Sequence, residues 1–239
     1  MNGPKTAMVL AAGLGKRMRP ITDRIPKPLV EIAGRSLLDR GLDRLEEVGV
    51  ETAVINVHHL GEQIAEHAAG RRTPRIIISD ERGRLLDSGG GVVKALPQLG
   101  EEAFFVLNAD TFWIDREGRD LDRLKLAWNR ASMDILLMLA DSAEATGHSG
   151  GTDFTMAADG RLARSKGDPA GLVYAGAFIV NRAIFAGAEA EPHSLNLYFD
   201  RAIAAGRLFG QRMKGAWITV GTPDAIGAAE ARLAALGVK

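Results

Sequence analysis

The sequence predicts an α/β protein, a single domain with a mixed, mostly parallel β-sheet that helices cover on both faces. Two observations support this fold class. Short apolar runs typical of buried parallel strands alternate with segments whose apolar residues recur at helical spacing. The chain has 239 residues, of which 46% are hydrophobic and 25% charged, so it is able to bury a real core. No linker in the sequence is long enough to separate two independent domains.

The alternation is clearest in the first half of the chain. Residues 6–11 form a continuous apolar run before two glycines, which predicts a buried strand ending in a turn. Ser36 begins a predicted helix because it has capping-box spacing to Asp39, and apolar residues follow at a 3.6-residue period until Gly49. The other elements expected here are strands at 52–57, 75–79, 104–108 and 133–140 and helices at 62–69, 92–96 (after a glycine loop at 89–91) and 121–131.

After about residue 145 the sequence changes to shorter segments. Residues 147–171 are rich in Gly, Ser and Asp, which predicts loops and short strands. The final helix is expected to have Thr222 as its N-cap and Pro223 in its first turn, and to run to about Leu236. The remaining expected elements are strands at 152–156, 161–163 and 172–180 and a helix at 194–205. We therefore expect one domain over residues 1–239.

Composition excludes several classes of protein. The absence of cysteine excludes disulfides, thiolate zinc sites and a cysteine nucleophile. Thirty basic residues balance thirty acidic ones and aromatic residues are only 5% of the chain, which argues against nucleic-acid or membrane partners. The basic residues Lys16, Arg17 and Arg19 follow the apolar run at 7–14 immediately, where a secretion signal has a cleavage site of small residues. We predict a cytoplasmic protein and, because no heptad repeat or self-complementary stripe occurs, a monomer.

Basic residues nevertheless gather in one loop. Between residues 16 and 27 the chain has five basic residues and a single acid. Ligands of open parallel sheets bind at the carboxyl ends of the strands, and this loop follows the first predicted strand. Gly13 and Gly15 allow the backbone to approach phosphate oxygens, and the basic side chains balance their charge. The loop predicts a small anionic ligand, although it matches neither the P-loop nor the dinucleotide-binding fingerprint.

Five motifs occur in a fixed order along the chain. They are Leu10-Ala-Ala-Gly-Leu-Gly-Lys-Arg-Met-Arg-Pro20 with Pro26-Lys-Pro-Leu29, then Leu86-Asp-Ser-Gly-Gly-Gly-Val92, Asn108-Ala-Asp110, Tyr174-Ala-Gly-Ala-Phe178 and Trp217-Ile-Thr-Val-Gly-Thr-Pro223. Together they resemble the signature of the sugar-1-phosphate nucleotidyltransferases over nearly the whole chain. The second motif, with its three glycines, most resembles the members that transfer uridylyl groups to N-acetylmuramate-1-phosphate.

The resemblance implies a Rossmann-like fold of the nucleotide-diphospho-sugar transferase type and an enzymatic reaction. A sugar-1-phosphate attacks the α-phosphorus of a nucleoside triphosphate, and pyrophosphate leaves. Because the attacking phosphate is already ionised, the site needs cations and amide donors and no general base. The alternatives are guanylyl or thymidylyl transfer to mannose-, heptose- or glucose-1-phosphate, and a nucleotide-binding regulatory homologue without turnover.

The resemblance also assigns residues to roles. Residues 1–145 would mainly bind the nucleotide and residues 146–239 the sugar. Arg17 would clamp the triphosphate, Lys27 would contact the reacting phosphates, and Asp110 would bind Mg²⁺. The other nucleotide-binding residues implied are Leu10, Ala11, Ala12, Gly13, Gly15, Lys16, Gly89 and Gly90. The sugar-binding residues implied are Asn108, Asp153, Gly176 and Lys166, the last without the Glu-Lys-Pro context usual in the family.

One residue departs from the family pattern. The late motif normally carries an aspartate that is a second metal ligand, and this chain has Thr219 there. Threonine is a neutral and weaker oxygen ligand. Two interpretations follow. In the one we prefer, Asp110, triphosphate oxygens and water coordinate Mg²⁺. In the other the metal site is weakened, and this motivates the regulatory alternative.

Other conspicuous residues have ordinary structural interpretations. His58 and His59 have no partner at metal-ligand spacing, so we expect them in a loop or at the edge of the core. Residues 80–82 are expected to form a solvated turn, with a contact from one of them to the ribose or base as the alternative. Trp217 is expected to pack in the core. Asp224 is expected to be a favourable negative charge at a helix N-terminus.

Overall fold

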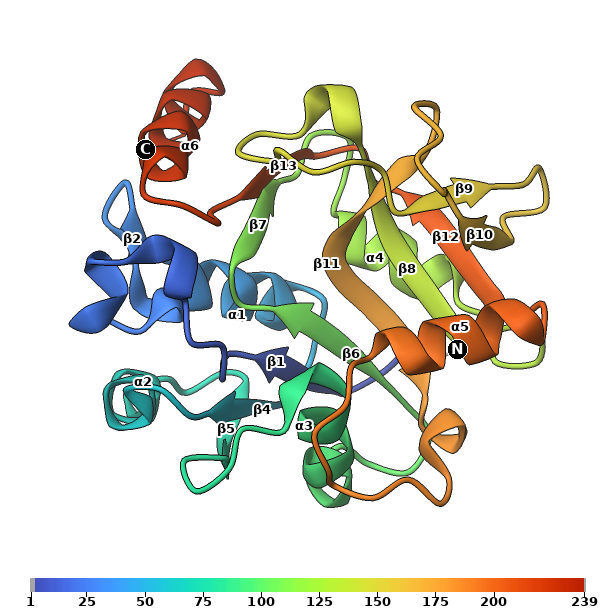
Figure 1. The fold of residues 1–239 in the computed structure, drawn as a ribbon, viewed down its shortest axis with the longest axis horizontal. Helices are drawn as coiled ribbons and strands as arrows, with labels where there is room; N and C mark the ends of the chain where they lie inside the picture. Colours follow the sequence, from blue (N-terminus) through green and yellow to red (C-terminus); the bar gives the residue numbers. More distant parts are fainter. Residues whose placement is uncertain (1–2, 239) are drawn as a thin grey trace.

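The computed structural model describes residues 3–238, and its centre is a mixed nine-stranded sheet (Figure 1). The strands are β1 (Thr6–Leu10), β4 (Thr52–Val57), β5 (Arg75–Asp80), β6 (Ala103–Asn108), β8 (Ile135–Asp141), β9 (Phe154–Met156), β10 (Leu162–Arg164), β11 (Leu172–Asn181) and β12 (Leu208–Arg212). Along the main path their order is β10-β9-β11-β6-β1-β4-β5, and β8 lies between β11 and β12. Strands β6, β1, β4 and β5 are parallel, whereas β11 runs antiparallel to β6 and β8.

Helices cover both faces of this sheet. They are α1 (Leu37–Glu47), α2 (Gly61–Ala69), α3 (Asp87–Ala95), α4 (Asp120–Ala127) and α5 (Asn196–Ala204). Residues of α1, α2 and α4 pack in one apolar cluster, and residues of α3 and α5 pack in the cluster on the opposite face. The predicted fold class is therefore confirmed. No helix within residues 3–238 is both long enough and apolar enough to cross a bilayer.

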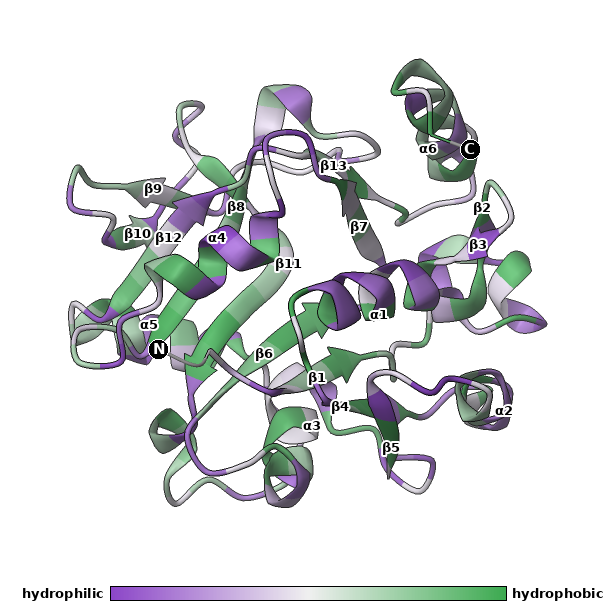
Figure 2. Ribbon diagram, turned by 180° about the vertical axis from the view of Figure 1, so that it is seen from behind, coloured by the Kyte–Doolittle hydropathy of each residue, from purple (hydrophilic) through white to green (hydrophobic). Residues whose placement is uncertain are grey.

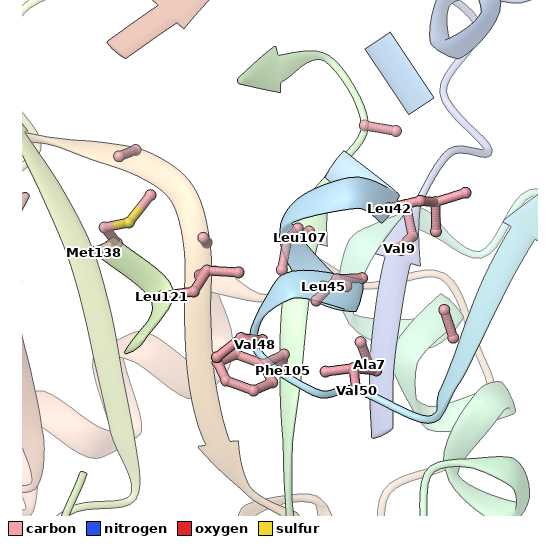
Figure 3. Packing of buried hydrophobic residues seen from close by; sticks show 14 of the residues in the cluster. Ala7, Val9, Leu42, Leu45, Val48, Val50, Phe105, Leu107, Leu121 and Met138 are labelled. Carbon is pink, nitrogen blue, oxygen red and sulfur yellow. The ribbon is translucent and has the colours of Figure 1, made fainter. Parts of the chain in front are cut away.

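The alternation of side chains along each strand explains why both faces are buried. In β1, Val9 belongs to the cluster under α1, whereas its neighbour Met8 belongs to the cluster under α3. Figure 2 shows hydrophobic residues along β6, β8 and β11, and Figure 3 shows Leu42 of α1 lying over Val9. Full burial of a leucine side chain contributes about 1.5–3 kcal/mol to folding, so an amphipathic α1 is held firmly on the sheet.

A small third layer lies at one end of the sheet; the sequence analysis predicted its helix but not its strands. It consists of the antiparallel pair β7 (Thr111–Ile114) and β13 (Ala216–Thr219), the pair β2 (Glu31–Ile32) and β3 (Arg35–Ser36), and the helix α6 (Asp224–Ala235). Met18, Phe112 and Ile218 are buried in its apolar cluster. This layer places the end of β13 beside the residues that follow β6.

Several element boundaries were predicted well and others were wrong. Ser36 is the N-cap of α1, and its Oγ accepts a hydrogen bond from the Asp39 N–H at 3.0 Å. The glycines 89–91 do not form a loop before a helix; they lie inside α3, which begins at Asp87. A methyl group on Gly90 would clash with the carbonyl oxygen of Glu191, so glycine is needed here for close packing of the helix. The structure ends α4 at Ala127, starts β8 at Ile135 and places Pro223 as the N-cap of α6.

Candidate active site

A cavity of about 280 Å³ opens at the carboxyl ends of β1 and β6, where a parallel sheet binds ligands. Most of its lining comes from the segments that follow β1, β5 and β6. The lining residues are Leu10, Ala11, Ala12, Gly13, Lys27, Pro28, Asn56, Leu85, Asp87, Ser88, Asn108, Ala109 and Asp110. Seven of the predicted site residues thus meet in one place, because the first and fourth predicted strands are neighbours in the sheet.

An ion pair between Lys27 and Asp110 lies in this cavity. Lys27 Nζ is 2.7 Å from Asp110 Oδ2, and the side chains are 11% and 38% exposed. Lys27 is held by a short 3-10 helix (Lys27–Leu29), and Asp110 directly follows β6. A phosphate is a natural partner for the ammonium group, and a divalent cation is a natural partner for the carboxylate. The two charges are therefore placed to bind a metal-complexed phosphate together.

A buried hydrogen-bond network that the sequence analysis missed holds the base of the cavity. Asn56 Oδ1 accepts from the Ala11 N–H at 2.8 Å, and Asn56 Nδ2 donates to Glu81 Oε1 at 2.7 Å. Glu81 Oε2 accepts from the Leu86 N–H at 3.1 Å. The expectation that residues 80–82 form a solvated turn is wrong for Glu81, which is 1% exposed. The one sequence signal for the network is a polar Asn56 at the end of an otherwise apolar strand.

Gly89 and Gly90, to which the resemblance assigns nucleotide binding, are not among the residues that line the cavity. Their backbone N–H groups both donate to the carbonyl oxygen of His193, at 2.8 and 3.2 Å. A Cβ on Gly91 would lie 2.7 Å from both Asn56 Nδ2 and Glu81 Oε1. The three glycines therefore allow α3 to approach its neighbours, and Asp87 and Ser88 line the cavity in their place.

Lys16 and Arg17 of the first loop lie outside the cavity lining, unlike Lys27. Gly15 has φ +60°, and its carbonyl oxygen accepts from Thr22 Oγ1 at 2.8 Å, so it shapes the loop. Lys16 and Arg17 are exposed on the next turn, a 3-10 helix (Lys16–Met18). The Arg17 guanidinium extends toward the end of β13, where a methyl group on Gly221 would lie 3.7 Å from it.

A second cavity of about 210 Å³ adjoins the first. It is lined by Leu10, Ser88, Asn108, Asp153, Phe154, Arg164, Tyr174, Ser194, Leu195, Asn196 and Phe199. Leu10, Ser88 and Asn108 line both cavities. Asp153 Oδ2 accepts from the Tyr174 N–H at 2.9 Å. Asn108 and Asp153, two of the predicted sugar-binding residues, thus both line the second cavity, which adjoins the first along Asn108.

The other two predicted sugar-binding residues lie elsewhere. Gly176 sits in an irregular part of β11 with φ +82°, where a side chain would clash with Thr111 Oγ1. Its role in the structure is to let β11 pass close to Thr111. Lys166 is exposed and lines neither cavity, whereas Arg164 on β10 does line the second one.

The Tyr174 hydroxyl is buried without a hydrogen-bond partner among residues 3–238. Burial, together with the nearby charges of Asp110 and Asp153, raises the pKa of this hydroxyl well above its ordinary value. An unpaired buried hydroxyl costs free energy. We expect Tyr174→Phe to raise the free energy of unfolding by about 1 kcal/mol, measured by urea denaturation. A loss of stability in this variant would contradict the unpaired state of the hydroxyl.

Thr219 lies beside Asp110, as the resemblance requires. It pairs with Thr111 across β13 and β7, and the next N–H, from Val220, donates to the Asp110 carbonyl oxygen at 3.1 Å. Within residues 3–238 no three His, Cys, Asp or Glu side chains are grouped to hold a metal ion. His58 Nδ1 and His59 Nε2 contact backbone carbonyl oxygens, at 2.7 and 2.8 Å.

Trp217 is 4% exposed, and its indole N–H donates to the Ala175 carbonyl oxygen at 2.9 Å. The prediction that this tryptophan packs in the core is confirmed.

Comparison with known proteins shows what this chain is similar to. Residues 7–151 match the MobA-like NTP transferase domain. The chain is 47% identical to the N-acetylmuramate alpha-1-phosphate uridylyltransferase of Caulobacter vibrioides, over 97% of this chain and 98% of that protein. It is 34% identical to the protein of the same name from Neisseria meningitidis, over 90% of this chain and 93% of that protein.

The chain belongs to the sugar-1-phosphate nucleotidyltransferase family.

Solved structures share the fold of this nucleotidyltransferase. HddC from Yersinia pseudotuberculosis, complexed with GMP-PN, aligns with a TM-score of 0.77 at 21% identity, covering 96% of this chain and 99% of that one. The site chemistry also fits a metal-assisted reaction. Mg²⁺ in nucleotide sites is usually held by one or two carboxylates plus phosphate oxygens and water, and Asp110 supplies one accessible carboxylate in the first cavity.

Proposed function

We propose that this nucleotidyltransferase transfers the uridylyl group of UTP to N-acetylmuramate α-1-phosphate, forming UDP-N-acetylmuramate and pyrophosphate. The observation that carries the proposal is the 47% identity, over almost the full length of both chains, to the Caulobacter uridylyltransferase. The proposal includes a role in peptidoglycan recycling, a cytoplasmic location and action as a monomer on small-molecule substrates.

The two adjoining cavities support binding of the two substrates at separate sites. The first is lined only by residues from 10 to 110, and we assign it to the nucleotide. The second draws most of its lining from residues 153–199, and we assign it to the sugar. The parts expected from the sequence, 1–145 and 146–239, are thus our proposed nucleotide and sugar halves. Leu10, Ser88 and Asn108 form the shared wall, so the two phosphates would meet near the end of β6.

The proposed reaction needs positive charge near the phosphates and correct positioning of the two substrates. A phosphate oxygen of the sugar-1-phosphate forms the new bond to the α-phosphorus, and the bond to the bridging oxygen of pyrophosphate breaks. Lys27 would bind the reacting phosphates, Arg17 would clamp the triphosphate, and the Gly13 backbone would allow a close approach. Asp110 would hold Mg²⁺, and Asn108 and Asp153 would orient the sugar. When bound, Mg²⁺ supplies positive charge to the triphosphate oxygens.

A carboxylate in place of Thr219 is expected to strengthen the metal site. Because Thr219 lies beside Asp110, Thr219→Asp would add a second acidic ligand. We expect it to lower the Mg²⁺ concentration for half-maximal activity about three- to tenfold, measured by Mg²⁺ titration of pyrophosphate release. Thr219→Asn, which is matched in size to the aspartate variant but neutral, is the control. Equal Mg²⁺ requirements in the two variants would show that position 219 does not contact the metal.

The proposed reaction is tested by measuring pyrophosphate release with Mg²⁺, N-acetylmuramate-1-phosphate and UTP, dTTP, GTP, CTP or ATP in separate reactions. Parallel reactions contain glucose-, mannose- or N-acetylglucosamine-1-phosphate. Release with UTP and the muramate substrate supports the proposal. Faster pyrophosphate release with another pair of nucleotide and sugar phosphate would support the same class of reaction with different substrates. Absence of release in every reaction, with UTP still raising the melting temperature, favours the regulatory alternative.

A further inference from the structure

The second cavity carries one positive charge. Of the described residues that line it, Arg164 is the single basic one and Asp153 the single acidic one. Asp153 already accepts the Tyr174 N–H through Oδ2, which leaves Oδ1 to accept from a neutral hydroxyl. A sugar bound here therefore meets one carboxylate suited to hydroxyl groups and one guanidinium suited to an anion.

Neighbouring residues hold the Arg164 side chain in a defined orientation. Its Nε donates to Asp200 Oδ1 at 2.9 Å and its Nη2 donates to Asn196 Oδ1 at 2.8 Å, both from α5. The guanidinium also lies over the Phe154 ring, 4.9 Å from the ring centre. Nη1 has no hydrogen-bond partner among residues 3–238. The guanidinium is thus fixed through Nε and Nη2 and free to donate through Nη1. The arginine side chain therefore loses little conformational freedom when an anion binds.

We propose that Arg164 determines the choice of sugar by donating hydrogen bonds to a carboxylate on it. The inference rests on the proposed function, because the lactyl ether of N-acetylmuramate carries a carboxylate that N-acetylglucosamine lacks. A carboxylate in a half-enclosed cavity is costly to bind without a cationic partner, and a guanidinium is the best match to its two oxygens. Phe154, Leu195 and Phe199 provide apolar surface for methyl groups on the same sugar.

Arg161 provides a matched control on the same β9–β10 region of the chain. It is also an arginine that pairs with an aspartate, Asp159, and lies over an aromatic ring, that of Phe209. It lines neither cavity. The two arginines therefore differ mainly in whether they face the proposed sugar site.

The test compares kcat/KM for N-acetylmuramate-1-phosphate and N-acetylglucosamine-1-phosphate, with UTP and Mg²⁺, in the full-length wild type, Arg164→Gln, Arg164→Lys and Arg161→Gln. We expect Arg164→Gln to lower kcat/KM for the muramate substrate about 30- to 300-fold, mainly through KM, and to leave the glucosamine substrate within about twofold. Arg164→Lys keeps the charge without the planar guanidinium, so its kcat/KM for the muramate substrate should fall between those of the wild type and Arg164→Gln. Arg161→Gln should match the wild type.

A substrate variant tests the same contact without a mutation. N-acetylmuramate-1-phosphate with its lactyl carboxylate converted to the amide should react with the wild type about as slowly as the acid reacts with Arg164→Gln. Equal losses for both sugars in Arg164→Gln, or an unchanged preference, would overturn the role of Arg164 and leave the proposed reaction standing. A wild type that does not use N-acetylmuramate-1-phosphate would overturn the proposed function and this inference together.

Discussion

Replacing Lys27 with methionine is expected to lower kcat/KM for pyrophosphate release about 10²- to 10³-fold. Of the described residues, Lys27 is the one basic residue that lines the first cavity. Its ammonium, 2.7 Å from Asp110, is placed where the α-phosphate of the nucleotide would meet the carboxylate proposed to hold the metal. Methionine keeps the length and apolar stem of lysine but cannot stabilise negative charge on the reacting phosphates or on the departing pyrophosphate.

The control for this experiment is Lys5→Met. Lys5 also pairs with a carboxylate, with Nζ 2.9 Å from Glu51 Oε1, but it lies on the surface before the start of β1, at the opposite end of that strand. Lys5→Met should retain the wild-type kcat/KM, and both variants should melt within a few degrees of the wild type. A loss of less than tenfold in Lys27→Met would show that Lys27 does not contact the reacting phosphates.

The buried Asn56–Glu81 pair yields the second large expected effect, on stability and activity together. In Asn56→Asp a carboxylate replaces the amide that now donates to Glu81 at 2.7 Å, so two buried carboxylates would face each other. In Glu81→Gln the new amide N–H₂ must face either Asn56 Nδ2 or the Leu86 N–H, and both are donors. Each single variant is expected to lose about 2 kcal/mol in free energy of unfolding.

The double variant Asn56→Asp/Glu81→Gln restores every hydrogen bond. The introduced aspartate accepts from the Ala11 N–H and from the glutamine amide, and the glutamine oxygen accepts from the Leu86 N–H. We expect its free energy of unfolding to lie within about 1 kcal/mol of that of the wild type. It should also recover the kcat/KM lost in the single variants, because Ala11 lines the proposed nucleotide cavity. Urea denaturation of the four proteins measures the coupling. Additive losses in the double variant would contradict the network.

Local patterns determined which elements could be predicted. The apolar run of β1 and the N-cap at Ser36 are short-range signals, and the structure places both elements as expected. The strands β7 and β13 were missed because each has only four residues and depends on a partner about 100 residues away. Glu81 was wrongly assigned to solvent because its burial depends on Asn56 and on the backbone at Leu86.

By itself, the sequence was sufficient to predict the fold class, the family and the loops that carry the site. Strand ends in a parallel sheet gather at one edge, so the sequence alone predicts that Lys27, Asn108 and Asp110 lie together. Only the tertiary structure showed that Lys27 pairs with Asp110, that the amides of Gly89 and Gly90 bind His193, and that Arg164, not Lys166, lines the second cavity. The physical reason is that these contacts join segments that sequence spacing does not relate. Strand order, the irregularity in β11 and the close approach of α3 to the segment before α5 decide which of many polar side chains face the same space.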